Sequence, residues 1–179
     1  MSNLPHELIP LGYQSRREGR SQQALEIFSR SLELCRDGTD QSALASSLVG
    51  LGQIERDLGN IPAVLQHYRE AVDIYRSQPN QLRLAHTIRH LADILREAGS
   101  LEEARPGYQE ALKIYRDHVE TPPLDLANAI RGYALLRGSA GETEEAKALW
   151  QEARGLYESV HVQAGVDESD EQIAELTTT

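Results

Sequence analysis

The sequence has little that would place it in a membrane or an oxidising compartment. It contains one cysteine, so no internal disulfide can form. It has no apolar run of about 18 residues, so we expect no segment to span a membrane. The first seven residues lack a basic stretch followed by an apolar core, so we expect no secretory signal. Together these absences favour a cytoplasmic location.

Aromatic residues and positive charge are also scarce. Only 5% of residues are aromatic while 40% are hydrophobic, so Leu, Ala and Ile must do most of the packing, which suits contact between helices. The net charge of −10 argues against nucleic acid as the main partner, because phosphate contacts need a basic face. We find no glycine-rich phosphate loop and no paired nucleophile and base, so we expect neither a cofactor nor enzyme activity.

The clearest positive signal is an internal repeat. Gly99 separates two amphipathic stretches, and equivalent glycines follow similar stretches at Gly19, Gly59 and Gly141. After each glycine come a small or aliphatic residue, an aromatic residue and a second small residue, at Ala24, Phe28 and Ser31, at Val64, Tyr68 and Ala71, at Ala104, Tyr108 and Ala111, and at Ala146, Trp150 and Ala153. The copies are offset by 40, 40 and 42 residues, so one supersecondary unit is used four times.

The repeat predicts an all-α fold, a right-handed superhelix of helix pairs that forms a single domain over residues 1–179. Apolar residues at three-and-four spacing predict amphipathic helices, and the glycines are typical of positions just beyond a helix end. The four pairs are expected at about residues 5–38, 41–78, 81–120 and 123–160, and a capping helix at about 163–176. We expect the capping helix to turn Ile173, Ala174 and Leu176 inward and to present an acidic exterior.

The repeat is similar to the tetratricopeptide (TPR) pattern. Its second copy carries Leu51-Gly52, Gly59, Val64, Tyr68 and Ala71, and its third carries Leu91-Ala92, Gly99, Ala104, Tyr108 and Ala111. The basic repeat has 34 residues. The longer period here resembles the kinesin-light-chain type, in which a proline stands where Pro106 stands. The resemblance covers about residues 8–160 and implies a scaffold for protein recognition with no chemistry of its own.

The resemblance also implies where a partner would bind. In this family a peptide usually lies in the concave groove lined by the first helix of each pair. By register, the groove-facing residues of this protein are Tyr13, Gln53, Arg56, His86, Arg89, His90, Asp93, Arg96, Asn128 and Arg131. Kinesin-light-chain-like repeats commonly carry asparagine, which can bond a peptide backbone, at the positions taken here by Arg89, His90, Arg131 and Gly132.

Arginine in place of asparagine changes the expected ligand. A guanidinium favours carboxylates or phosphates through forked hydrogen bonds. We therefore expect the groove to bind an acidic peptide segment or the C-terminus of a partner protein, with Arg89 and Arg131 as anchors. In the alternative interpretation, these arginines pair with Asp93, Glu97 or neighbouring acids and bind no ligand.

A metal or enzyme site is a further alternative. His86, His90 and Asp93 fall at positions i, i+4 and i+7, so they share one helix face and could present two imidazoles and a carboxylate to one metal ion. No fourth ligand is evident. Cys35 takes the place of a core tyrosine in the other repeats, so we interpret it as a buried packing residue rather than a nucleophile.

Two further alternatives are self-assembly and a regulatory role, such as sensing a small molecule, that does not use the peptide groove. Leu4, Leu8 and Leu11 form an apolar edge at the N-terminal end of the array, and no polar helix precedes them. Two copies could pair through this end helix, in which case the working scaffold would be a homodimer.

Overall fold

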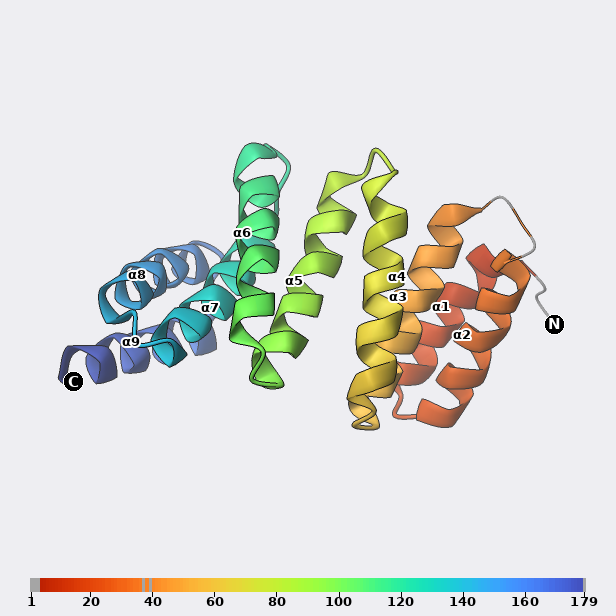
Figure 1. The fold of residues 1–179 in the computed structure, drawn as a ribbon, viewed down its shortest axis with the longest axis horizontal. Helices are drawn as coiled ribbons and strands as arrows, with labels where there is room; N and C mark the ends of the chain where they lie inside the picture. Colours follow the sequence, from red (N-terminus) through yellow and green to blue (C-terminus); the bar gives the residue numbers. More distant parts are fainter. Residues whose placement is uncertain (1–3, 37, 39, 179) are drawn as a thin grey trace. The chain divides into compact units, whose positions relative to one another are not determined.

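The computed structural model describes residues 4–36, 38 and 40–178, and within them the protein forms nine helices and no strand (Figure 1). In sequence order the helices are α1 (Pro5–Arg17), α2 (Ser21–Arg36), α3 (Gln41–Asp57), α4 (Ile61–Arg76), α5 (Gln81–Glu97), α6 (Leu101–Asp117), α7 (Pro123–Ser139), α8 (Thr143–Ser159) and α9 (Gln163–Thr178). The all-α class and the four helix pairs followed by a further helix are confirmed. We call α1, α3, α5, α7 and α9 the A helices and the others the B helices.

The turn inside each helix pair is built on the repeated glycine. Positive φ angles between 72° and 81° occur at Gly19, Gly59, Gly99 and Gly141. Side chains rarely adopt this conformation, but glycine does so at little cost. The next backbone N–H then bonds a carbonyl five residues back, as from Asn60 to Glu55 at 2.8 Å, which satisfies the end of the A helix. The repeat read from the glycines is therefore a repeat of structure.

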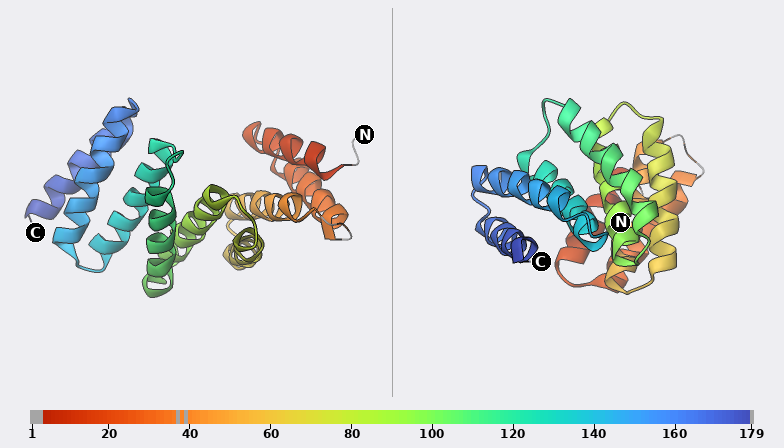
Figure 2. Two further views of the ribbon diagram at one scale, coloured as in Figure 1. Left: turned by 90° about the horizontal axis from the view of Figure 1, so that it is seen from above. Right: turned by 60° about the vertical axis from the view of Figure 1, so that its left-hand side comes forward.

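The protein divides into two compact units, one reaching to Thr87 and the other starting at Ile88, so the division falls within α5. In unit 1, α1 packs against α2 and α3, and α3 packs against α2 and α4. In unit 2, α7 packs against α6 and α8, and α9 packs against α8, an arrangement visible in the left view of Figure 2. The assignment of residues 1–179 to a single domain stays a prediction.

The core of unit 1 forms where a buried aromatic ring meets glycines on the A helices. The ring of Phe28 on α2 is fully buried and faces Gly12 on α1 and Gly50 on α3. A Cβ atom added at Gly12 would lie 2.7 Å from the ring, and one at Gly50 would come closer still. These positions must be glycine because the ring occupies the space that a side chain would need. Cys35 and Trp150 are buried as well, as the sequence predicted.

Gly132 on α7 has a similar role in unit 2. A Cβ atom at this position would lie 2.6 Å from Cε1 of Tyr108 and 2.7 Å from Oδ1 of Asp93. Asparagine, the common residue of kinesin-light-chain-like repeats at this position, therefore cannot fit while Tyr108 and Asp93 keep their places. This departure from the family pattern follows from local packing.

The inward face expected for α9 is wrong at Ala174 and does not include the residues that are most buried. The buried residues of this helix are Gly165, Val166 and Ser169, whereas Ala174 is exposed. Ile173 and Leu176 are only half-buried. The helix packs through small residues near its start, including Gly165 against the ring of Tyr157 on α8, and a search for large apolar residues overlooks such a face.

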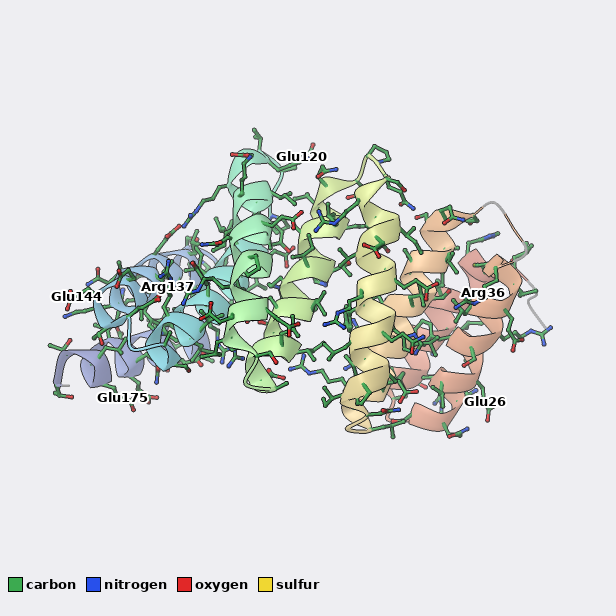
Figure 3. All side chains as sticks on the ribbon, viewed as in Figure 1. Glu26, Arg36, Glu120, Arg137, Glu144 and Glu175 are labelled. Atoms are coloured by element: carbon green, nitrogen blue, oxygen red, sulfur yellow. The ribbon has the colours of Figure 1, made fainter. Side chains whose placement is uncertain are left out.

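Charged side chains project outward from the helices, as Glu26, Glu144 and Glu175 do in Figure 3. In the part of the protein that the structure describes, no helix combines the length and the apolar character needed to cross a lipid bilayer.

Candidate functional site

Side chains on the A helices bond to the next A helix at a regular spacing. Three such bonds join partners 37 residues apart, namely Arg16 to Gln53, Arg83 to Ser46, and Arg131 to Glu168. This spacing is one repeat less about one helical turn, so the three bonds share one offset between neighbouring A helices, although they lie at different positions along the helices. Within each unit the polar side chains of the A helices thus form one surface, which we call the A-helix face of that unit.

In unit 1 the predicted residues Tyr13 and Gln53 lie on this face beside an ion pair that the sequence did not reveal. Arg16 donates to Oε1 of Gln53 at 3.1 Å and to both carboxylate oxygens of Asp57 at 2.7 and 3.0 Å. Tyr13 packs edge-on against Phe28, with ring centroids 5.0 Å apart. Burial raises the pKa of Tyr13 to about 12, so its hydroxyl stays protonated and able to donate a hydrogen bond.

In unit 2 the predicted residues Arg89, His90, Asp93 and Arg96 form one hydrogen-bonded network with Tyr108 of α6. Asp93 accepts from Arg89 at 2.8 Å and from the Tyr108 hydroxyl at 2.6 Å. Arg96 donates to the Tyr108 oxygen at 3.3 Å, and Nη2 of Arg89 lies 2.8 Å from Nε2 of His90. The side chains of Arg89 and Asp93 are only 11% and 13% exposed. For Arg89, the structure thus shows the ion-paired alternative.

Burial dominates the electrostatics of this network. It raises the pKa of the Asp93 carboxyl, although Arg89 and Tyr108 both favour the ionised form. Burial and the neighbouring Asp93 also raise the pKa of Tyr108, so its hydroxyl remains a donor. An additional anion at Arg89 would have to reach a largely buried guanidinium and would be repelled by Asp93, which already compensates its charge.

Arg131 on α7 forms an ion pair with Glu168 on α9. Its Nε and Nη2 donate to the two carboxylate oxygens of Glu168 at 2.6 and 2.5 Å. The two side chains are 38% and 35% exposed, so this pair is more accessible than the pair on α5. One turn before Arg131, Asn128 accepts a hydrogen bond from the Tyr157 hydroxyl at 2.9 Å. Besides covering the end of the array, α9 therefore adds a carboxylate to the A-helix face.

The structure argues against a metal site at His86, His90 and Asp93. Among the described residues, no group of three or more His, Cys, Asp and Glu side chains is placed to hold a metal ion. Both oxygens of Asp93 accept hydrogen bonds, and Nε2 of His90 faces a guanidinium rather than an open position.

Two further residues of the predicted groove-facing set, His86 on α5 and Arg56 on α3, are both half-buried.

A hollow of about 290 Å³ opens in unit 1 and was not foreseen from the sequence. Its lining comes from three A helices and the residue before α3, and consists of His6, Ile9, Pro10, Asp40, Ser42, Ala43, Ser46 and Arg83. The repeat pattern gives no signal for it, because the position of Arg83 is taken by Ala43 and Asp125 in the neighbouring repeats.

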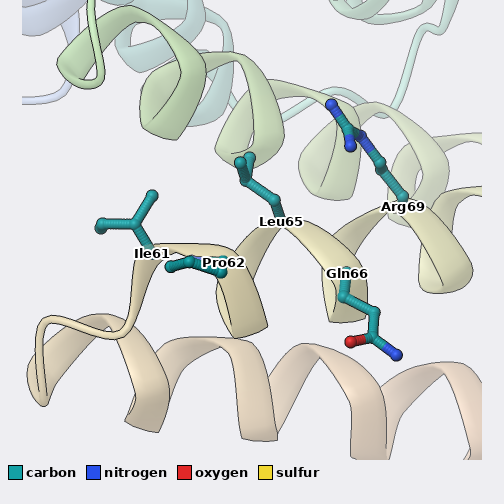
Figure 4. Close-up of a pocket in the computed structure, with 5 residues that line it drawn as sticks. All are labelled: Ile61, Pro62, Leu65, Gln66 and Arg69. Atoms are coloured by element: carbon teal, nitrogen blue, oxygen red, sulfur yellow. The ribbon is translucent and has the colours of Figure 1, made fainter.

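A second hollow, of about 640 Å³, lies along α4 (Figure 4). Its lining in the described structure is Ile61, Pro62, Leu65, Gln66 and Arg69. Ile61, Leu65 and Arg69 rise from the same side of the helix in Figure 4, as residues four apart do. The lining is mostly aliphatic and offers few polar groups to orient a ligand, so we assign it no function.

Comparison with known families accounts for the repeat and its turns. A family model, the MalT-like TPR region, matches residues 7–175. The protein belongs to this family. The tetratricopeptide-type assignment made from the glycines and aromatic residues is thereby confirmed, whereas no curated protein matches the sequence.

Two solved structures are similar to this TPR region. BtubC (BKLC) from P. vanneervenii is 16% identical, with a TM-score of 0.73 over 97% of the present sequence and 81% of its own. A Rap protein, solved in complex with Competence and Sporulation Factor, is 17% identical, with a TM-score of 0.78 over 98% of the present sequence. The match spans 49% of that Rap protein, about half its length. At these identities the likeness concerns the fold, and it confirms the solenoid class.

Proposed function

We propose that this TPR region is a non-catalytic recognition scaffold that holds a segment of a partner protein against its A-helix faces. The observation that supports the proposal is the regular bonding between successive A helices, which fixes their polar side chains in advance. Side chains that are already ordered lose little conformational freedom when a partner binds, so more of the contact energy appears as affinity. One protein of similar fold, a Rap protein, was solved in complex with Competence and Sporulation Factor.

The proposed contact residues are the groove-facing residues predicted from the sequence. Some of them would contact the partner directly, and others would hold their neighbours in place. An acidic partner segment can reach Arg131, because more than a third of its side chain is exposed. Arg89 is a weaker anchor because it is largely buried and already bonded to Asp93. We therefore propose that Arg131 contacts the partner directly and that Arg89 keeps Asp93 and Tyr108 in place.

A matched pair of arginines tests this proposal. Arg131 forks onto Glu168 from an A helix, and Arg116 bonds both oxygens of Glu152 from the B helix α6, at 3.0 and 2.8 Å. Peptides would be selected from a random 12-residue display library on the wild-type protein. Their affinities would then be measured by fluorescence anisotropy on R131Q and on R116Q.

We expect R131Q to weaken the selected peptides by about tenfold, since it removes a charged hydrogen-bonding group from the binding face. R116Q should leave the affinities unchanged, because it removes a similar ion pair from a B helix. Equal losses in the two variants, or peptides insensitive to R131Q and to Asn128→Ala alike, would overturn binding on the A-helix face.

Self-association through α1 is a second candidate, and one observation favours it. Leu11 on α1 and Leu4 just before it are 44% and 52% exposed, whereas Leu8 is buried inside unit 1 and cannot belong to such an edge. Light scattering over a concentration series tests it. A dimer mass that reverts to the monomer in Leu11→Gln would support the candidate, and a monomer at every concentration would exclude it.

A further inference from the structure

We infer that the hollow among α1, α3 and α5 in unit 1 is a carboxylate-binding site, with Arg83 as the group that holds the ligand. The inference deepens the proposed function and rests on it in one respect, since the carboxylate would come from the bound partner. All the residues that form the site are described residues of unit 1.

Arg83 stands apart from the other arginines whose contacts define the A-helix faces. Arg16, Arg89 and Arg131 each bond a carboxylate of this protein. Among the described residues, the guanidinium of Arg83 bonds only a hydroxyl, Oγ of Ser46 at 3.3 Å. The guanidinium is therefore oriented, but no carboxylate of the described residues is bonded to it.

Ser46 is well suited to orient Arg83. Its hydroxyl donates to the carbonyl of Ser42 at 2.8 Å, which leaves its oxygen free to accept. That oxygen lies 3.1 Å from the Tyr75 hydroxyl and 3.3 Å from Arg83. The arrangement holds one end of the guanidinium on α3 and leaves its remaining N–H groups available to a ligand.

The rest of the hollow supplies what a small carboxylate needs. The Ser42 hydroxyl and the His6 ring line it and can donate hydrogen bonds, while Ile9 and Pro10 provide an aliphatic wall. A few polar groups converging beside apolar surface are typical of ligand sites. A hollow of about 290 Å³ has room for one side chain or for the end of a polypeptide.

The charge balance favours a carboxylate over a phosphate. Asp40 also lines the hollow, and its Oδ1 caps α3 by accepting from the backbone N–H of Ala43 at 2.9 Å. With one guanidinium and one carboxylate in its described lining, the hollow carries little net charge, so a singly charged carboxylate meets less repulsion from Asp40 than a doubly charged phosphate would. A carboxylate also matches the planar fork of an arginine.

The test is an amide NMR titration of the protein, residues 1–179, with three small probes in phosphate-free buffer. N-acetylalanine offers a terminal carboxylate, and N-acetylglutamate α-methylamide offers a side-chain carboxylate. N-acetylalanine methylamide is the neutral control. We expect saturable shifts of the Ala43 and Ser46 amides with at least one acid, at Kd values on the order of millimolar for such small ligands. The acid that binds more tightly identifies the source of the carboxylate.

Three variants make the result specific. R83Q should weaken the acid by about tenfold or more, because it removes the charged donor. D40N should tighten binding, because asparagine still caps the helix but no longer repels the ligand. R17Q is the matched control, since Arg17 is an exposed arginine at the end of α1 that does not line the hollow, and it should change nothing.

The outcomes separate this inference from the proposed function. Equal shifts with the neutral methylamide, or equal losses in R83Q and R17Q, would overturn the carboxylate site. If the library peptides still depended on Arg131 in that case, the recognition scaffold would stand without it. If the acids bound as expected while no peptide depended on the A-helix faces, the carboxylate site would stand and the partner-binding role would fall.

Discussion

Arg83 and Arg89 lie on the same helix, six residues apart, yet in the described structure only Arg89 is paired with a carboxylate of the protein. Arg89 is 11% exposed and bonds Asp93, which in turn accepts from Tyr108. Arg83 is exposed and bonds only a serine hydroxyl among the described residues. The charge of Arg89 is therefore paired with a carboxylate inside unit 2, while the charge of Arg83 in unit 1 has no described carboxylate bonded to it and lies beside a hollow.

The difference follows from burial. A charge removed from water must be paired and hydrogen-bonded, so Arg89 can occupy its place only together with Asp93. An exposed charge remains solvated, and a partner can compensate it without disrupting the fold. An arginine on the binding face of a repeat protein therefore does not by itself indicate an anion site. Its exposure and its bonding within the protein together decide whether it stabilises the scaffold or binds a ligand.

The largest expected effect is the loss of Asp93. Asp93→Ala should destabilise the protein by about 3 kcal/mol, because it leaves Arg89 and the Tyr108 hydroxyl largely buried without an acceptor. The control is Asp117→Ala, which breaks an ion pair with Lys113 whose side chains are 65% and 77% exposed. That variant should cost less than about 0.5 kcal/mol. Urea denaturation measures both, and equal losses would contradict the contrast between buried and exposed pairs.

Gly132 tests the packing that holds this network. Gly132→Ala should cost about 2 kcal/mol, because its Cβ would press against Tyr108 and Asp93. Gly155 on α8 provides the control, since a Cβ there meets no atom within 4 Å. Gly155→Ala should instead stabilise the helix by about 1 kcal/mol. Thermal or urea unfolding that gave both variants the same sign would show that crowding at Gly132 is not the cause.

These residues also show how far the sequence could lead. The helices and turns were predictable because each leaves a local signal, such as glycine at a left-handed position or a recurring aromatic residue. The pairing of Arg89 with Asp93 was visible as an alternative because the residues lie four apart on one helix. Tyr108 and Gly132, which complete the network, come from other helices. Arg83 gave no signal because its role depends on a hollow formed by three helices.

An acid titration of Glu142 should give a smaller effect. Arg105 and Arg137 both bond this carboxylate and lower its pKa from 4.5 to about 2. A lowered folded-state pKa adds stability above the unfolded value, and this stability is lost as the pH falls towards about 2. Glu142→Gln should therefore be less stable than wild type at pH 6, with the difference shrinking from about pH 4.5 downwards. Glu144→Gln is the control, because it removes an exposed carboxylate two residues away and should change the stability at pH 6 by less than about 0.5 kcal/mol.

Arg83→Gln should have the smallest effect on stability, although it should weaken carboxylate binding the most. Arg83→Gln removes an exposed charge that bonds only Ser46 among the described residues, so unfolding should shift by less than about 0.5 kcal/mol. Arg89→Gln should cost several times more, because Asp93 would lose its ionic partner in a largely buried place. Urea denaturation of the two variants, which remove the same charge from the same helix, measures this directly. A large loss in Arg83→Gln would show that Arg83 belongs to the scaffold, and the contrast between the two arginines would then disappear.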